Sequence, residues 1–113
     1  GAILPGRRIL RKSLNDYTAK LPLTDLTAAV PSFPGNNTVD AIDLGTDCAA
    51  IGAVRELVRR METEFPGQKI RRVACGGDAP FFLRELPDFE LADELFTLRG
   101  IAELYRHGVV SIG

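Results

Sequence analysis

Hydrophobic residues near the N-terminus recur at helical spacing, which predicts an amphipathic helix over residues 7–20. The stripe consists of residues separated by four, three and four positions, namely Leu10, Leu14, Tyr17 and Leu21. The opposite face carries the basic residues Arg7, Arg8, Arg11 and Lys12. Such a cluster can meet phosphate, but a solvated helix face is the commoner explanation. We therefore expect these basic residues to face water.

A second, longer apolar stripe predicts a helix of about 25 residues in the middle of the chain. Its members are Ile42, Ala49, Ala53, Leu57, Met61 and Phe65. We expect Thr38 to be the N-cap of this helix, with Asp40 in the first turn and Pro66 beyond its end. Residues 45–53 are largely small, which allows another helix to approach closely. The helix, over residues 39–65, is therefore a candidate interface for a homodimer.

The second half of the chain alternates between strand-like and helix-like segments, as layered α/β proteins do. Strands are expected over residues 70–75 and near residues 89–91, with a short helix after Gly77 between them. A final helix is expected over residues 97–107. A short edge strand can follow it, formed by Val109, Val110 and Ile112. The fold class is therefore α/β, with a mixed sheet flanked by helices, and 113 residues predict a single domain.

Two segments of the first half interrupt regular structure. The opening residues GAILPG read as the end of a buried strand that runs into a Pro-Gly turn. Residues 21–37 contain Pro22, Pro31, Pro34 and Gly35 among small polar residues, which predicts a long irregular connection. Long loops inside compact domains are usually functional or disordered.

The composition narrows the possible partners and the compartment. Hydrophobic residues make up 45% and charged residues 26%, as in globular proteins, and the net charge of -1 gives no field to attract nucleic acid. No apolar stretch approaches the roughly 20 residues of a membrane-spanning helix, and no signal-peptide pattern is present. Cys48 and Cys75 are isolated in sequence, which favours free thiols in the cytoplasm.

A turn rich in glycine is the first candidate for chemistry. Gly76, Gly77 and Asp78 follow a predicted strand and precede a predicted helix. Glycines let a nucleotide lie against the backbone, and the helix N-terminus offers free N–H groups to an anion. The alternative is a tight turn in which Asp78 only caps the helix.

The remaining candidates are polar residues around the long helix and the single histidine. Thr38 ends a polar loop and can hold a small substrate, although simple capping explains it equally. Asp43, Gly45 and Thr46 imitate an Asp-x-Gly-Thr phosphate loop, but they lie within the helical pattern, so we reject that function. His107 has no partner residues spaced for catalysis or for a metal and is expected at the surface.

Four segments, in order and spacing, resemble the C-terminal half of type III pantothenate kinases, a family also called Bvg accessory factor or Baf proteins. They are GAILPG, PGNNTVDAI, ACGGDAPFFLRELP and LFTLRGIAELYRHG. The resemblance covers nearly the whole chain and implies one lobe of an actin-like ATPase, with a ribonuclease H-like fold. It also implies phosphorylation of pantothenate by ATP in coenzyme A synthesis, in a homodimer that requires Mg and a monovalent cation, K or NH4.

The resemblance also assigns roles to individual residues. Thr38 stands where family members bind pantothenate, and Gly76, Gly77 and Asp78 stand at the turn that borders the nucleotide. The chain departs from the family pattern at two positions. Asn36 stands where family members usually have a basic residue, and Cys75 stands where they have a threonine or serine, so the resemblance supports substrate contacts from the first loop and nucleotide contacts from the second less firmly.

Three motifs of the family are not found in these 113 residues in the strand-and-turn context that they require. They are the Asp-x-Gly-Asn-Thr loop, the Gly-x-Asp-Arg segment with the catalytic aspartate, and the second Asp-x-Gly-Thr loop. Phosphoryl transfer depends on positioning, charge neutralisation and an acidic group near the hydroxyl. We therefore expect no catalytic residue and no metal ligand in the chain, which should be an inactive part of a longer kinase. The alternative is a non-catalytic regulatory module of the Baf type, or a dimerisation domain.

Overall fold

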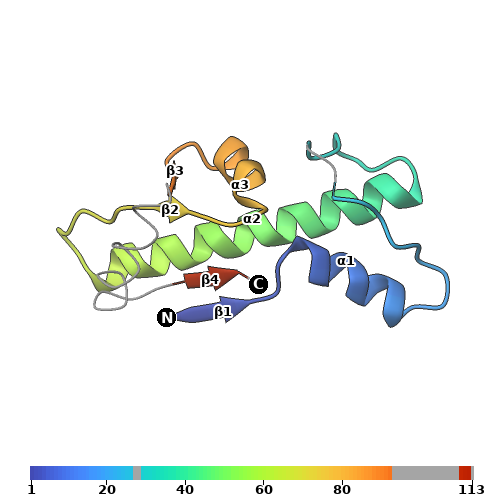
Figure 1. Ribbon diagram of the computed structural model, residues 1–113, viewed down its shortest axis with the longest axis horizontal. Coiled ribbons are helices and arrows are strands. Elements are labelled where there is room, and N and C mark those ends of the chain that lie inside the picture. The colour runs from blue at the N-terminus through green and yellow to red at the C-terminus, as the bar shows by residue number, and fades with distance from the viewer. Residues whose placement is uncertain (27–28, 93–109, 113) are drawn as a thin grey trace. The chain divides into compact units, whose positions relative to one another are not determined.

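The computed structural model describes residues 1–26, 29–92 and 110–112, and it contains both helices and strands (Figure 1). In chain order the elements are β1 (Ala2–Leu4), α1 (Arg7–Asp16), α2 (Thr38–Glu64), β2 (Val73–Ala74), α3 (Ala79–Glu85), β3 (Glu90–Leu91) and β4 (Val110–Ile112). The α/β class is therefore confirmed. The helix expected over residues 97–107, including His107, lies outside the described residues.

The chain divides into two compact units, and each is described by itself. The N-terminal unit consists chiefly of Ile3–Val54, and the C-terminal unit of Arg55–Ser111. The strands of the described residues form two two-stranded sheets, one from β1 and β4 and one from β2 and β3. The single domain that we expected stays a prediction.

The first helix is shorter than predicted and buries a different face. Helix α1 ends at Asp16, and Tyr17 caps it by donating its N–H to the Ser13 carbonyl at 3.0 Å. Tyr17 is 88% exposed, so the expected apolar stripe does not continue to it. The buried residues of α1 are Arg7 and Arg11, and the expectation that both would face water is wrong.

Helix α2 confirms the long helix that the apolar stripe predicted. It spans 27 residues and ends where Pro66 and Gly67 follow, with Gly67 at a φ of 77° that favours glycine. Within the N-terminal unit, its buried apolar side chains are Ile42, Ala50, Ile51 and Val54. The same buried stretch includes Asp43, Thr46 and Asp47, which are polar.

The C-terminal unit contains a small β–α–β arrangement. Strands β2 and β3 are parallel, with Val73 opposite Glu90, and α3 contacts both strands. A helical connection is what parallel neighbours require. The apolar core of this unit includes Phe81 and Phe82, whose rings meet edge to face at 5.2 Å. The strand expected over residues 70–75 is confirmed only in its last part.

Strand β1 confirms the strand expected at the start of the chain, and β4 confirms the edge strand near its end. The expectation that the first strand is buried is wrong, because Ile3 is 88% exposed. None of the described helices combines the length and apolar character that crossing a bilayer requires.

Candidate functional site

The N-terminus of α2 is capped by Asn37. Its side-chain Oδ1 accepts the Asp40 N–H at 2.8 Å, and its carbonyl accepts the Ala41 N–H at 2.9 Å. The prediction that Thr38 is the N-cap is therefore wrong by one residue. Asparagine and threonine are both good caps, and the sequence Asn37-Thr38 offered either.

The position of the cap changes what Thr38 can do. Thr38 is the first residue of α2 and is exposed, so its hydroxyl is not used to cap the helix. It lies at the positive end of the helix dipole. This position suits a hydroxyl that contacts a polar or anionic ligand, and simple capping no longer explains Thr38.

The loop before α2 approaches the helix backbone very closely at Gly35. A Cβ on Gly35 would lie 2.7 Å from Ala41 Cα and 2.8 Å from Ala41 N, closer than real side chains come. Only glycine fits there without movement of the backbone. The loop is thus seated on the first turn of α2, immediately before Thr38.

Four buried charged residues, here called the Arg–Asp cluster, join α1 to α2: Arg7, Arg11, Asp43 and Asp47. Asp47 is fully buried, and its Oδ1 accepts from Arg7 Nε at 2.7 Å and from Arg11 Nη2 at 2.9 Å. Arg11 Nε lies 3.2 Å from Asp43 Oδ1. Two cations therefore face two anions, as buried charges require.

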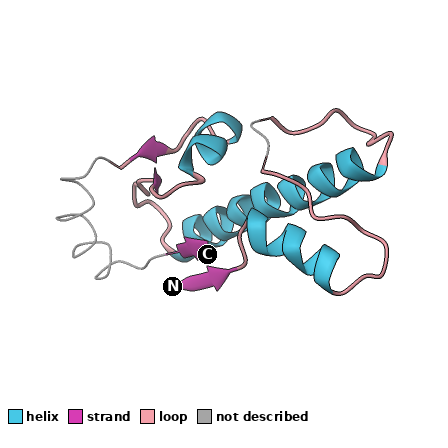
Figure 2. Cartoon of the chain, turned by 45° about the vertical axis from the view of Figure 1, so that its right-hand side comes forward, coloured by secondary structure: helices cyan, strands magenta, loops and turns pink. Residues whose placement is uncertain are grey.

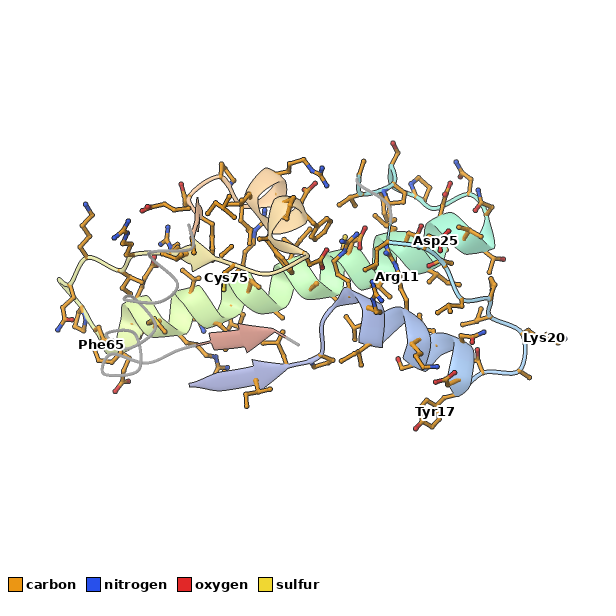
Figure 3. The ribbon with its side chains drawn as sticks, viewed as in Figure 1. Arg11, Tyr17, Lys20, Asp25, Phe65 and Cys75 are labelled. Atoms are coloured by element: carbon orange, nitrogen blue, oxygen red, sulfur yellow. The ribbon has the colours of Figure 1, made fainter. Side chains whose placement is uncertain are left out.

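Arg11 connects three segments of the N-terminal unit (Figure 3). Besides Asp47, its Nε donates to Thr46 Oγ1 at 3.1 Å and its Nη1 donates to the Asp25 carbonyl at 3.1 Å. Helix α1 supplies Arg11, α2 supplies its acidic partners, and the loop between the helices supplies Asp25. A planar guanidinium with five N–H donors is suited to such a junction.

One residue earlier, the same loop also makes a bond to α2. Thr24 Oγ1 donates to Asp43 Oδ1 at 2.6 Å. Figure 2 shows the loop as the connection between α1 and α2. It is held at Thr24 and Asp25 by the Arg–Asp cluster and at Gly35 by the first turn of α2.

The spacing of the charged residues in the sequence is a signal for the Arg–Asp cluster, although it did not enter the prediction. Arg7 and Arg11 are four residues apart, and so are Asp43 and Asp47, so each pair lies on one face of its helix. The rejection of an Asp-x-Gly-Thr phosphate loop is confirmed, because Asp43 lies inside α2. Its carboxylate instead serves the cluster.

The glycine turn lies in the C-terminal unit and has the predicted strand-to-helix position. Gly76 has a φ of 98°, which favours glycine, and its carbonyl accepts the Ala79 N–H at 3.2 Å. Asp78 precedes α3 but makes no side-chain capping bond to that helix. Asp78 therefore occupies the N-cap position of α3, as the alternative interpretation had it, and its carbonyl accepts the Phe81 N–H at 3.2 Å.

Exposed ion pairs lower the pKa of two carboxylates away from these residues. Hydrogen bonds from Arg59 and then Arg60 lower the pKa of Glu56 to about 2. A hydrogen bond from Arg71 lowers the pKa of Glu90. Both pairs are surface features. Within the described residues, no group of three or more His, Cys, Asp or Glu side chains could hold a metal ion.

The two candidate positions are thus an exposed hydroxyl at a helix N-terminus and a glycine turn between strand and helix. Together with the α/β fold, they are typical of enzymes that bind nucleotides and small metabolites. Comparison with known proteins narrows this class to one family. The family profile for type III pantothenate kinase matches residues 1–60, and the chain belongs to that family.

Individual relatives cover much more of the chain. A type III pantothenate kinase from Rubrobacter xylanophilus is 37% identical over 109 residues, or 93% of this chain. Type III pantothenate kinases from Dehalococcoides mccartyi and Kosmotoga olearia are each 37% identical, over 94% and 90% of the chain. The chain spans only 41%, 40% and 38% of these relatives. No solved structure matches it significantly.

Proposed function

We propose that this chain is the C-terminal part of a cytoplasmic type III pantothenate kinase, which transfers the γ-phosphoryl group of ATP to the hydroxyl of pantothenate. The observation that carries the proposal is the 37% identity to a relative of that name over 93% of the chain. In this proposal the chain contributes to one lobe of an actin-like ATPase.

Thr38 has the role of a pantothenate contact in this proposal. The capping of α2 by Asn37 supports it, because the exposed Thr38 hydroxyl is left available to a ligand. The N-terminal end of a helix also favours the carboxylate of pantothenate, or the charge that develops on the transferred group.

Gly76, Gly77 and Asp78 have the role of a backbone surface beside the nucleotide. A Cβ on Gly76 or Gly77 would meet nothing within 4 Å, so the turn is open on its outer side. Catalysis requires an acidic group to accept the hydroxyl proton and cations to neutralise charge. We assign the catalytic aspartate, Mg and the K or NH4 ion to parts of the kinase outside these 113 residues.

A homodimer through α2 completes the proposal. The residues that support it are small, exposed and spaced along one face of α2: Gly45, Cys48, Ala49 and Gly52. Small residues allow two helices to approach closely. Sedimentation of the full-length protein should show a dimer that Gly52→Leu dissociates, and a monomeric unaltered protein would exclude this interface.

The enzymatic proposal is tested with the full-length protein encoded by the gene, assayed for ADP release with ATP and pantothenate. Thr38→Ala should raise the KM for pantothenate by at least about tenfold, the effect of losing one hydrogen bond to a charged ligand, while thermal stability is unchanged. Thr63→Ala is the matched control, because Thr63 is exposed near the other end of α2 and bonds only the Arg59 carbonyl in the described structure. Equal pantothenate kinetics in the two variants would remove Thr38 from the site.

A further inference from the structure

The loop that precedes α2 is fixed at both ends, and both fixed points lie close to the first turns of α2. At its start, Thr24 and the Asp25 carbonyl are bonded to the Arg–Asp cluster. At its end, the Gly35 backbone lies against Ala41. Thr38 follows directly, so the position of its hydroxyl depends on how the loop enters the helix.

We propose that Thr24 and Arg11 are positioning residues for pantothenate, which act by holding this loop on α2. The inference rests on the proposed function. It adds to the exposed Thr38 two partly buried hydrogen bonds, from Arg11 to the Asp25 carbonyl and from Thr24 to Asp43. Arg11 is 1% exposed and bonds the loop at the Asp25 carbonyl, so in this proposal it acts through the loop.

The bonds are suited to fixing geometry because they are directional. Arg11 Nη1 meets the Asp25 carbonyl at 3.1 Å while its Nη2 is held at 2.9 Å by Asp47. The planar guanidinium thereby sets the angle of the loop backbone relative to α2. Thr24 adds a short bond of 2.6 Å to Asp43, the second acid of the cluster.

Loops are among the least stable parts of a fold, so one bond can decide how often they adopt the binding-competent arrangement. The apparent affinity for a ligand falls in proportion to the competent fraction. Losing one hydrogen bond to a buried carboxylate changes the ratio of competent to non-competent loop by about tenfold, so the competent fraction falls by up to about tenfold. The effect should fall on pantothenate, because ATP is assigned to the other unit of the chain.

The test compares two substitutions of Thr24 in the full-length protein. Thr24→Val keeps the shape and removes the hydroxyl, whereas Thr24→Ser keeps the hydroxyl. We expect Thr24→Val to raise the KM for pantothenate about tenfold, with kcat and the KM for ATP changed by less than about twofold, and Thr24→Ser to behave like the unaltered protein.

Arg11→Lys is the second variant. It keeps the buried positive charge, but one ammonium group cannot reach Thr46, Asp47 and the Asp25 carbonyl together. The same selective rise in the KM for pantothenate is expected. If this variant proves unstable, the Thr24 pair still decides the matter, because valine leaves Asp43 its partner Arg11.

A measurement without substrate separates this inference from the proposed function. Hydrogen exchange of peptides that cover residues 21–26 should be faster in Thr24→Val than in Thr24→Ser. Faster exchange with an unchanged KM for pantothenate would overturn the positioning role alone. Equal rises in the KM for pantothenate and for ATP would also overturn it, since they would indicate a general loss of stability. An unaltered protein that does not phosphorylate pantothenate would overturn the proposed function, whatever the exchange shows.

Discussion

Replacing Asp47 by asparagine isolates the charge of the Arg–Asp cluster. Asp47 is 0% exposed, and its Oδ1 accepts from both arginines. Its Oδ2 has no hydrogen-bond partner among the described residues. In Asp47→Asn the amide oxygen can keep the two bonds of Oδ1, while the amide nitrogen meets no opposing donor at Oδ2. The variant therefore removes one negative charge with little change of shape.

The expected loss of stability is large because the two buried cations, Arg7 and Arg11, both lose the negative charge that they share at Asp47. Hydrogen bonds to charged groups contribute about 1.5–3 kcal/mol each, roughly twice the value for neutral groups. Breaking a buried ion pair by removing one partner costs about 3–5 kcal/mol. We therefore expect the free energy of unfolding to fall by about 3–5 kcal/mol, a third or more of the total for many domains.

Urea unfolding of the chain, followed by circular dichroism, measures this loss. With a denaturant slope of about 1–3 kcal/mol/M, the midpoint should fall by at least about 1 M. Asp16→Asn is the matched control. It makes the same substitution in an exposed pair, where Lys12 Nζ lies 3.0 Å from Asp16 Oδ2, and should change stability by less than about 0.5 kcal/mol. Equal midpoints for the two variants would refute the account of a buried, mutually dependent cluster.

Three further predictions concern the helix cap, the loop and the surface. Asn37→Ala should destabilise the protein by about 1 kcal/mol in urea unfolding, and Asn37→Ser should change it much less, because serine keeps a capping oxygen and adds no charge beside Asp40. Gly35→Ala should cost about 1–3 kcal/mol through its clash with backbone, whereas Gly77→Ala, with nothing within 4 Å of the added Cβ, should be neutral or slightly stabilising. The side-chain carboxyl of Glu56 should titrate near pH 2 by NMR, so its pairing stabilises fully above its ordinary pKa of 4.5 and is lost as pH falls through about 2. Arg59→Gln should raise that midpoint, and an unchanged midpoint would exclude the pairing.

Helix α2 shows what local sequence can determine. Its apolar spacing, a capping residue at its start and Pro66 beyond its end all act within a few residues of one another. The prediction was right about the extent of the helix, but the cap is Asn37 and not Thr38, and the predicted stripe is not the buried face, because Ala49 and Phe65 are exposed. The strand and edge-strand predictions at both ends of the chain were confirmed for the same local reason.

Helix α1 shows what local sequence cannot determine. A helical pattern gives the face on which Arg7 and Arg11 lie, but not whether that face meets water or opposite charge. The acids that pair with them are 32 to 40 residues away in the chain. A solvated face is the right default for basic residues, and it fails here because a second helix presents two carboxylates at the same spacing of four. The role of Gly35 was missed for the same reason, since its close contact with Ala41 exists only after the loop folds back.

The energetics of the Arg–Asp cluster argue for a geometric role. Burying four charges is expensive, and well-packed apolar residues of similar volume are often as stabilising as a buried ion pair or better. An apolar contact between α1 and α2, however, would place no directional constraint on the Asp25 carbonyl or on Thr24. Arg11 and Asp43 supply that constraint, because each bonds the other helix and the loop at once. A quadruple variant, Arg7→Met with Arg11→Leu, Asp43→Leu and Asp47→Leu, separates the two roles, because it leaves no member of the Arg–Asp cluster charged. It should keep most of the stability that Asp47→Asn loses and still bind pantothenate as weakly as Thr24→Val. Tight pantothenate binding by that quadruple variant would show that apolar packing positions Thr38 as well as the charges do.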